Sequence, residues 1–145
     1  MLFRSIKETL RVFPSVSVIA RQVVADCEIG GYPIKAGSLL YMSPWVMHRD
    51  AKYFDNPEQF MPERWNSDLE SRLPRHTYMP FSGGPRVCIG DRFAMMEATL
   101  LLANFLQKYE FEYAGDAPPK PFASLTLIPV GGMPVRIKQR AGVSS

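Results

Sequence analysis

The 145-residue sequence is poor in cysteine and histidine, with two of each. Two cysteines, Cys27 and Cys88, do not make the disulfide framework of a small secreted domain. A zinc site needs about four ligands, and the spacing of these cysteines with His48 and His76 matches no usual zinc pattern. The sequence therefore argues against a disulfide scaffold and against a zinc-binding domain.

Long apolar runs and a strong charge excess are also missing. The longest apolar stretch, LLLANFL, is broken by a polar residue and is too short to span a membrane. The N-terminus, MLFRSIKETLR, has no apolar core of signal-peptide length. Net charge is +3 with mixed signs along the chain, which argues against nucleic acid as a partner. We expect a soluble segment without a membrane segment of its own, and the cytoplasm as its location.

The composition is otherwise that of an ordinary globular protein, with 46% hydrophobic and 21% charged residues. A chain of this length suffices for one domain with its own core. Thirteen prolines predict frequent chain reversals and short elements. The last residues, AGVSS at 141–145, are typical of a flexible tail.

The first half of the chain predicts two helices and several strands. Apolar residues at helical spacing predict a helix over residues 2–13, which Pro14 ends. The β-branched stretch SVSVIARQVV predicts a strand, and two more strand-like runs flank a Gly-Gly turn. Ser43 is a candidate N-cap with Pro44 in the first helical position, which indicates a short helix.

The second half combines an irregular stretch with the strongest helix of the sequence. Residues 51–80 lack a regular period, which is unusual unless such a loop is functional or packed around something. Residues 91–113 contain no glycine or proline and predict a long helix. SLTLIPV and GMPVRIKQ predict two short strands, joined as a hairpin through a Gly-Gly pair.

Between these parts lies FSGGPRVCIG, from Phe81 to Gly90, which places a cysteine just before the long helix. The N-terminus of a helix favours an anion such as a thiolate, because its free N–H groups and its dipole carry positive charge. Gly84 and Gly90 allow tight turns and the close approach of a bulky partner. Arg86 alternates with Cys88 along the loop and adds a positive charge for carboxylates at the edge of a ligand.

Three interpretations of Cys88 follow from its local chemistry. A free cysteine is often a small apolar residue with a structural role. A catalytic cysteine needs a partner base, and neither His48 nor His76 stands in a motif for that role. A thiolate ligand of haem iron needs one cysteine, apolar walls and cationic partners for the propionates. Local chemistry leaves the structural role and the ligand role open.

The spacing F-x-x-G-x-R-x-C-x-G resembles the haem-binding loop of the cytochrome P-450 family, the haem-thiolate monooxygenases. Three further segments resemble that family in the right order along the chain. ETLR, with Glu8 and Arg11, is similar to its E-x-x-R helix, and PERW, with Arg64 and Trp65, is similar to its P-E-R-F segment. CIGDRFAMMEA resembles the start of its last long helix. Four motifs in family order make the resemblance specific.

The resemblance implies that Cys88 is the axial ligand of the iron of haem b and that Arg86 binds a haem propionate. Arg21 falls where many members place another propionate partner, although a solvent-facing arginine on a strand has the same pattern. Gly84 belongs to the haem-contacting loop, and Phe81 is expected to pack near the sulfur and to screen it from water.

The resemblance also implies a buried polar network, in which Glu8 and Arg11 pair with Arg64 and hold the irregular loop against the cofactor. Segments after Pro14 and near Ser124 resemble those that line the substrate pocket. Other conspicuous side chains are interpreted as structural, with the two methionines as core filler of the long helix: Cys27, His48, His76, Met95 and Met96.

The implied fold is α+β, the C-terminal haem-binding portion of the mainly helical family fold, with short β-hairpins and a long terminal helix. The resemblance implies that residues 1–145 are a partial domain of the family, from the E-x-x-R helix to the C-terminus. They correspond to about the C-terminal third of the family's chain, because the E-x-x-R helix stands at the start here. The family's central helix carries an acid/alcohol pair that delivers protons to bound oxygen, and no A-G-x-x-T type segment opens a helix in this sequence. Oxygen activation needs excluded water and delivered protons.

Two hypotheses follow from the resemblance. In the first, the chain is a fragment of a monooxygenase, in which haem activates O2 to oxidise a small organic substrate with electrons from a donor protein or reductase. In the second, the chain is a truncated haem-binding or inactive remnant without oxygenase activity of its own. The first hypothesis better describes the parent family, and the second better describes what these 145 residues do alone.

Overall fold

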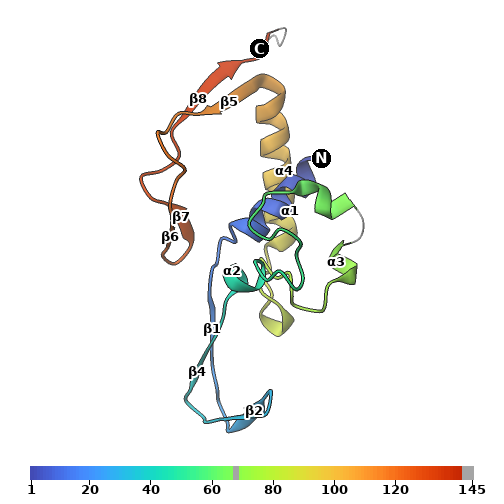
Figure 1. Cartoon of the computed structure of the whole chain (residues 1–145), viewed down its shortest axis with the longest axis vertical. Coiled ribbons are helices and arrows are strands. Elements are labelled where there is room, and N and C mark those ends of the chain that lie inside the picture. The colour runs from blue at the N-terminus through green and yellow to red at the C-terminus, as the bar shows by residue number, and fades with distance from the viewer. Residues whose placement is uncertain (67–68, 142–145) are drawn as a thin grey trace.

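The computed structural model describes residues 1–66 and 69–141, and it has an elongated, mixed architecture (Figure 1). Helices α1 and α4 lie side by side near the middle, and β-hairpins extend from both ends. The elements in chain order are α1 (Leu2–Val12), β1 (Ile19–Gln22), β2 (Cys27–Ile29), β3 (Tyr32–Ile34), β4 (Leu39–Met42), α2 (Pro44–Met47), η1 (Pro62–Asn66), α3 (Leu69–Arg72), η2 (Gly84–Arg86), α4 (Asp91–Lys108), β5 (Tyr109–Tyr113), β6 (Pro121–Ala123), β7 (Leu127–Pro129) and β8 (Val135–Gln139).

Helix α1 confirms the first predicted helix. It ends at Val12, two residues before Pro14, whose ring and missing N–H cannot continue a helix. The side of α1 that faces inward is polar, since Glu8 and Arg11 are fully buried beside Val12. Charged residues are rarely buried completely unless they are paired, so this face points to a specific ionic arrangement.

Two nested hairpins form the arm at the lower end of Figure 1. Strand β1 pairs antiparallel with β4, with Arg21 opposite Leu40, and β2 pairs with β3 inside that loop. Gly30 and Gly31 have φ angles of +59° and +84°, which suits a tight hairpin turn. The strands predicted on either side of the Gly-Gly turn are therefore confirmed, while the strand predicted over 15–24 shortens to β1.

The short helix α2 also begins as predicted. The Ser43 hydroxyl accepts a hydrogen bond from the Val46 N–H at 3.3 Å, and Pro44 occupies the first helical position. Beyond α2, the described part of residues 51–80 contains only the short helices η1 and α3. The absence of a long regular element from this stretch is thus confirmed, and turns connect its parts.

The C-terminal part differs from the sequence prediction in two ways. Helix α4 ends at Lys108 instead of Tyr113, and the following YEFEY forms strand β5. Strand β5 pairs with β8, and β6 pairs with β7. The predicted hairpin between SLTLIPV and GMPVRIKQ is therefore wrong, because each of these segments pairs with a different strand.

Alternating side chains explain both corrections. In the ladder of β5 and β8, Phe111 lies opposite Ile137 and Glu112 lies opposite Arg136. Because successive side chains of a strand point to opposite faces, apolar residues share one face of this hairpin and charged residues share the other. A helix has a period of 3.6 residues and cannot separate such alternating residues onto two faces.

The fold is the mixed α+β arrangement of helices and small hairpins that the sequence indicated. Helix α4 is the longest helix of the described residues, but it is not the terminal element that we expected, because four strands follow it. The predicted flexible tail at 141–145 lies outside the described residues except for its first position.

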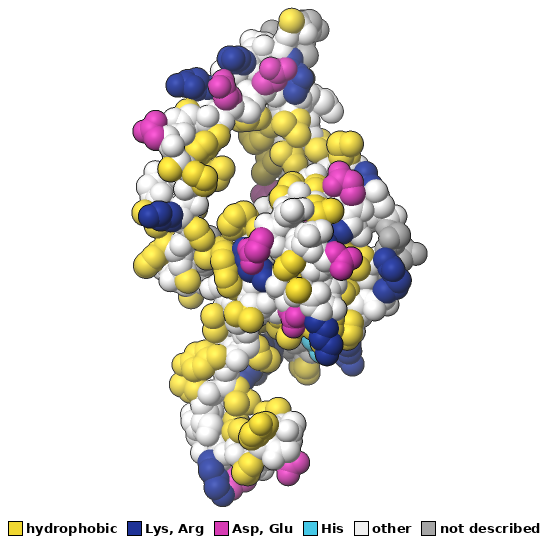
Figure 2. All heavy atoms as spheres, viewed as in Figure 1, with side chains coloured by type: hydrophobic (Ala, Val, Ile, Leu, Met, Phe, Trp, Pro, Cys, Tyr) yellow, Lys and Arg dark blue, Asp and Glu magenta, His cyan; other side chains and the backbone are white. Residues whose placement is uncertain are grey.

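The core is small and partly polar. Apart from prolines, the buried apolar side chains are Val12, Val23 and Phe54, and the buried polar ones are Glu8, Arg11, His48 and Thr77. Apolar side chains spread over the surface in Figure 2, where an open gap separates the β6–β7 arm from α4. In the part of the chain that the structure describes, no helix has the length and apolar character to cross a bilayer.

Candidate functional site

Glu8 is the centre of a buried ionic cluster between α1 and η1. Its Oε1 accepts from Arg11 Nη2 at 2.9 Å and from Arg64 Nε at 3.0 Å, and its Oε2 accepts from Arg11 Nε at 3.0 Å. The Met61 backbone N–H and the Trp65 indole N–H each add a bond of 2.9 Å. These five residues are called the Glu8 cluster below. The predicted network of Glu8, Arg11 and Arg64 is confirmed.

Arg11 uses all five of its N–H donors, within this cluster and beyond it. Besides its bonds to Glu8, its Nη1 donates to the His48 carbonyl at 2.8 Å and to the Pro57 carbonyl at 2.6 Å, and its Nη2 donates to the Gln59 carbonyl at 2.9 Å. A buried charge is tolerated when such bonds satisfy it. Arg11 therefore fixes the irregular chain around residues 48–59 against α1.

The sequence did not reveal the part that Met61 and Trp65 play. Burial alone would raise the pKa of Glu8, but hydrogen bonds from Arg11, the Met61 amide, Trp65 and Arg64 outweigh burial and hold that pKa below its ordinary value. The signal that could have identified Trp65 is its indole N–H, because the Phe of the related segment has no such donor. A backbone donor such as Met61 leaves no signal in the sequence.

The FSGGPRVCIG loop follows this cluster along the chain and folds back on itself. The Cys88 N–H donates to the Phe81 carbonyl at 2.9 Å, and the Val87 N–H donates to the Gly84 carbonyl at 3.1 Å. Gly84 has a φ angle of +70°, in the left-handed region that favours glycine. The two ends of the loop are thus joined by a backbone hydrogen bond, and a glycine makes the turn between them.

Cys88 is a free, exposed thiol just before α4. Helix α4 starts at Asp91 with Gly90 as its N-cap, where the sequence predicted the start. A side-chain carbon added at Gly90 would lie 3.9 Å from the Cys88 Sγ, so the sulfur lies close to the beginning of the helix. The other cysteine, Cys27, is exposed on β2.

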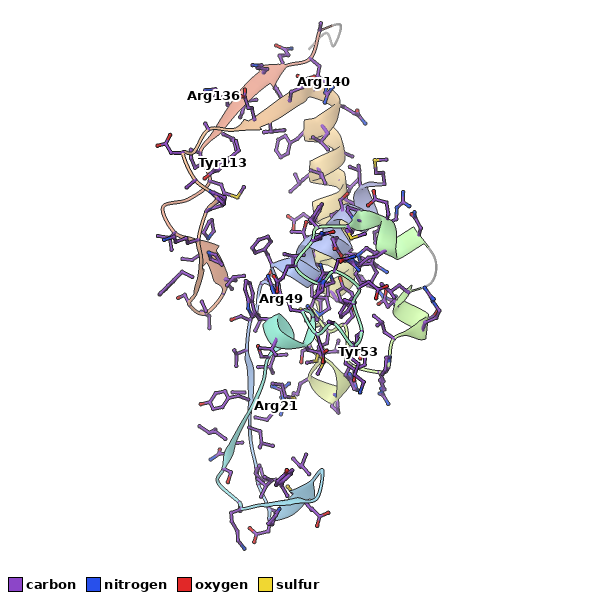
Figure 3. All side chains as sticks on the ribbon, viewed as in Figure 1. Arg21, Arg49, Tyr53, Tyr113, Arg136 and Arg140 are labelled. Atoms are coloured by element: carbon purple, nitrogen blue, oxygen red, sulfur yellow. The ribbon has the colours of Figure 1, made fainter. Side chains whose placement is uncertain are left out.

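The two arginines expected to contact a ligand lie on different elements. Arg86 ends η2 and is exposed, whereas Arg21 lies on β1 and is half-buried. Arg21 donates to the Ser82 hydroxyl at 3.4 Å and to the Ala20 carbonyl at 2.9 Å, and Figure 3 shows it on the strand that runs past the loop. The fold therefore brings Arg21 to the cysteine loop, to which Arg86 belongs.

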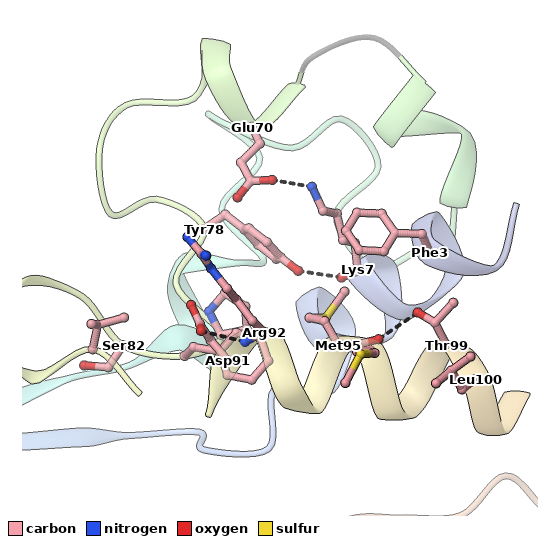
Figure 4. Close-up of a pocket in the computed structure, with 14 residues that line it drawn as sticks. Phe3, Lys7, Glu70, Tyr78, Ser82, Asp91, Arg92, Met95, Thr99 and Leu100 are labelled. Carbon is pink, nitrogen blue, oxygen red and sulfur yellow. Dashed lines mark hydrogen bonds and ion pairs between the residues drawn. The ribbon is translucent and has the colours of Figure 1, made fainter. Parts of the chain in front are cut away.

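A cavity of about 740 Å³ lies on one side of this loop, where α1, α3 and α4 meet (Figure 4). Phe81 is half-buried and lines it. Lys7 forms an ion pair with Glu70 at its rim, and the Tyr78 hydroxyl donates to the Lys7 carbonyl at 3.0 Å. Met95 and Met96 of α4 also line this cavity. Met96 is exposed, so the role of core filler that we expected for Met96 is wrong.

A second cavity, of about 720 Å³, lies on the β1 side of the loop. Arg21, Ser82 and Gly84 line it, together with His76. Cys88 lines neither of these two cavities. Its thiol is exposed at the surface.

The two histidines lie in different surroundings. His48 is fully buried, and its Nε2 accepts from the Met79 N–H at 3.0 Å. His76 packs against Gly83, where an added Cβ would lie 2.5 Å from the His76 Nδ1. Within residues 1–66 and 69–141, no three or more His, Cys, Asp or Glu side chains are grouped to hold a metal ion. These placements give no support to cysteine–histidine catalysis.

Comparisons with known proteins bear on the family of the chain. A family model described as Cytochrome P-450 matches residues 1–135. Cytochrome P-450 4V2 of Mus musculus is 41% identical over an alignment of 144 residues, and the match covers 93% of this chain and 26% of that protein. Cytochrome P-450 4d1 of Drosophila melanogaster is 40% identical over an alignment of 138 residues, and the match covers 93% of this chain and 27% of that protein. The chain thus spans about a quarter of the length of these relatives.

Solved structures show the same likeness. The cytochrome P-450DA heme domain matches with a TM-score of 0.87 and 32% identity, covering 96% of this chain and 30% of that one. The retinoic acid-bound cyanobacterial CYP120A1 matches with a TM-score of 0.87 and 25% identity, covering 94% of this chain and 32% of that one. The mixed helices and hairpins described above therefore correspond to part of a larger fold.

Proposed function

Because the chain belongs to the cytochrome P-450 family, we propose that Cys88 would hold the iron of a haem b through its thiolate. The observation that carries this proposal is the shape of the loop, which closes through the Cys88–Phe81 backbone bond and presents an exposed thiol at the start of α4. A thiolate is favoured at that position, because the free N–H groups of the first helical turn carry positive charge.

The residues around Cys88 fit a haem in their chemistry. A haem has apolar faces and carries two carboxylates on its edge. Val87 and Ile89 expose apolar side chains on either side of the thiol, and Arg86 adds an exposed cation. Thiolate, apolar contacts and a guanidinium are the set of groups that such a ligand requires.

Each residue of the proposed site has a separate task. Arg86 and Arg21 bind the propionates, and the bond from Arg21 to Ser82 supports a position for Arg21 next to the loop. Phe81 lines the first cavity, and in the whole protein we expect it to screen the sulfur from water, which tunes how strongly a thiolate donates to iron. Gly84 allows the left-handed turn that returns the chain from Phe81 to Cys88.

A thiolate-bound haem supplies electron donation that favours cleavage of the O–O bond. In the whole protein we therefore propose a monooxygenase that oxidises a small organic substrate with O2 and with electrons from a donor protein or reductase. The part that residues 81–90 play is to hold the thiolate charge, to limit the access of water to it and to neutralise the propionates.

Haem reconstitution followed by reduction and CO addition tests the ligand assignment. We expect the parent chain and a Cys27→Ser control to show the red-shifted Soret band of thiolate ligation, and Cys88→Ser to lose that band. A Cys88→Ser variant with the spectrum of the parent would contradict the assignment. A parent that binds haem without the red-shifted band would contradict it as well.

A second function, haem binding without oxygenase activity, is favoured by the exposure around the thiol. Cys88 is exposed and Ile89 is 103% exposed, whereas oxygen activation needs water to be excluded. The same haem-loaded samples separate the two functions. Peroxide-driven oxidation of a small substrate above the rate of free haem supports the monooxygenase, and a rate equal to that of free haem supports the second function.

A further inference from the structure

His48 links the Glu8 cluster to the start of the cysteine loop. It follows the last residue of α2 and is fully buried. Its carbonyl accepts from Arg11 Nη1 at 2.8 Å, and its ring Nε2 accepts from the Met79 backbone N–H at 3.0 Å. One residue is therefore bonded to α1 through its backbone and to the chain before FSGGPRVCIG through its side chain.

Further hydrogen bonds lead from Met79 into the loop. The Met79 carbonyl accepts from the Ser82 N–H at 3.1 Å, and the Ser82 hydroxyl accepts from Arg21 Nη2 at 3.4 Å. The Phe81 carbonyl accepts from the Cys88 N–H at 2.9 Å. The bond at Met79 thus ties the segment that carries Cys88 to the interior of the molecule.

This bond also determines which ring nitrogen carries the proton. Because Nε2 accepts the Met79 N–H, the neutral ring of His48 carries its own proton on Nδ1. Nδ1 is buried, and among the described residues no acceptor meets hydrogen-bond geometry with it. A proton on Nε2 would place one N–H against another, so the bond to Met79 exists only while the ring is neutral.

The groups that face the ring favour its neutral form. Burial lowers the pKa of His48 to about 4. The backbone of Arg11 and Leu10 opposes this effect without outweighing it, while the charges of Arg11 and Arg49 reinforce it. The ring of Tyr78 packs at 5.2 Å between centroids and is itself neutral, because burial raises the pKa of Tyr78 above its ordinary value.

We propose that His48 is a positioning residue, which holds Met79 and thereby the cysteine loop through its neutral ring and releases them when the ring is protonated. The inference concerns the chain without a cofactor. Its consequence for iron coordination rests on the proposed function of Cys88. A role in packing alone would require only a ring of similar size, so the two roles predict different results for different substitutions.

Amide hydrogen exchange in the full chain compares three substitutions at this position. In His48→Gln the side-chain oxygen can reach the position of Nε2 and accept the Met79 N–H. His48→Asn is too short to do so, and His48→Phe keeps a ring without an acceptor. In the Asn and Phe variants we expect the Met79 and Ser82 amides to exchange about 10- to 100-fold faster than in the parent, and in the Gln variant at about the parental rate.

A pH series on the parent and the Gln variant provides the second readout. After correction for the intrinsic exchange rate, we expect the protection of the Met79 amide in the parent to fall between pH 6.5 and about 4. The Gln variant is neutral throughout and should keep its protection. A Met79 amide that is unprotected at neutral pH, parental protection in His48→Phe, or equal loss in the Gln and Phe variants would overturn the positioning role.

The haem-loaded chain separates this inference from the proposed function. If Cys88 binds iron, we expect the red-shifted Soret band of the ferrous–CO form to weaken in His48→Phe and to persist in His48→Gln. If the amide results hold while the parent lacks that band, the ligand assignment fails and the positioning role stands. If the band persists in His48→Phe although the Met79 amide exchanges fast, His48 does not position the ligand.

Discussion

The Glu8 cluster and helix α4 reverse the usual distribution of polar and apolar residues. Glu8 and Arg11 are fully buried, and five hydrogen bonds reach the Glu8 carboxylate. Helix α4 is rich in leucine, methionine and phenylalanine, yet no residue in it is buried, and Phe93 and Leu100 are 62% and 56% exposed. The described chain thus has a polar interior beside an apolar surface.

The contrast shows that satisfied polar contacts order the Glu8 cluster, whereas the apolar side chains of α4 lack contacts that would bury them. A fully satisfied ionic cluster requires each partner in one position, so it fixes the path of an irregular chain that has no periodic pattern of its own. A helix that is apolar on all sides is normally buried on all sides, and contiguous exposed apolar surface marks a place of contact. We therefore expect substitutions in the cluster to cost much more stability than substitutions on the exposed apolar surface.

Removing the charge at the centre of the cluster should have the largest effect. In Glu8→Gln, the guanidinium of Arg11 stays buried without its carboxylate, which costs on the order of 3–5 kcal/mol in the free energy of unfolding. Urea denaturation of the parent and the variant measures this difference. A loss of that size is a large fraction of the stability of a small domain, so the variant is expected to unfold at a clearly lower urea concentration than the parent.

Glu70→Gln is the matched control, because Glu70 forms an ion pair with Lys7 while its side chain is 54% exposed. An exposed pair contributes about 0–1 kcal/mol, so this variant should stay close to the parent. Equal losses of unfolding free energy in Glu8→Gln and Glu70→Gln would show that the burial of Glu8 does not determine how much the cluster stabilises the fold.

How much of the cluster could be predicted depends on where its members lie. Glu8 and Arg11 are three residues apart on a helix with a clear period, and Arg64 stands in a recognisable segment. His48 and Met61 contribute through contacts that depend on the path of the irregular chain between them. That path has no periodic signal, because neighbouring backbone groups and not apolar spacing determine it.

The C-terminal strands show a different limit. YEFEY follows a strong helix pattern without glycine or proline, so helix propensity favoured a continuation to Tyr113. Pairing with β8 decides in favour of a strand, because Glu112 lies opposite Arg136 and 3.6 Å from Lys138 while Phe111 faces Ile137. This pairing joins segments that lie far apart in the sequence. Predicting it would have required the positions of β6 and β7, which lie between β5 and β8 along the chain.

Trp65 offers a way to weaken the Glu8 cluster without removing its charges. Trp65→Phe loses the indole N–H that donates to Glu8 Oε2 at 2.9 Å, while Arg11, Arg64 and the Met61 amide still bind the carboxylate. Because a hydrogen bond to a charged group contributes about 1.5–3 kcal/mol, we expect a loss of about that size or less. Urea denaturation checks it, and a loss as large as in Glu8→Gln would mean that the ring of Trp65 and not its N–H matters.

The smallest change in stability is expected at the most exposed of the large apolar side chains. Ile89 lies between Cys88 and Gly90 and is 103% exposed, so its side chain gains no burial energy from the described residues. Ile89→Ser should change the free energy of unfolding by less than about 0.5 kcal/mol, as is usual for surface substitutions. It should also lower the binding of a dye that senses exposed apolar surface. A loss of stability above that size would show that Ile89 packs against something in solution, and the apolar surface around Cys88 would then have to be counted as a buried contact.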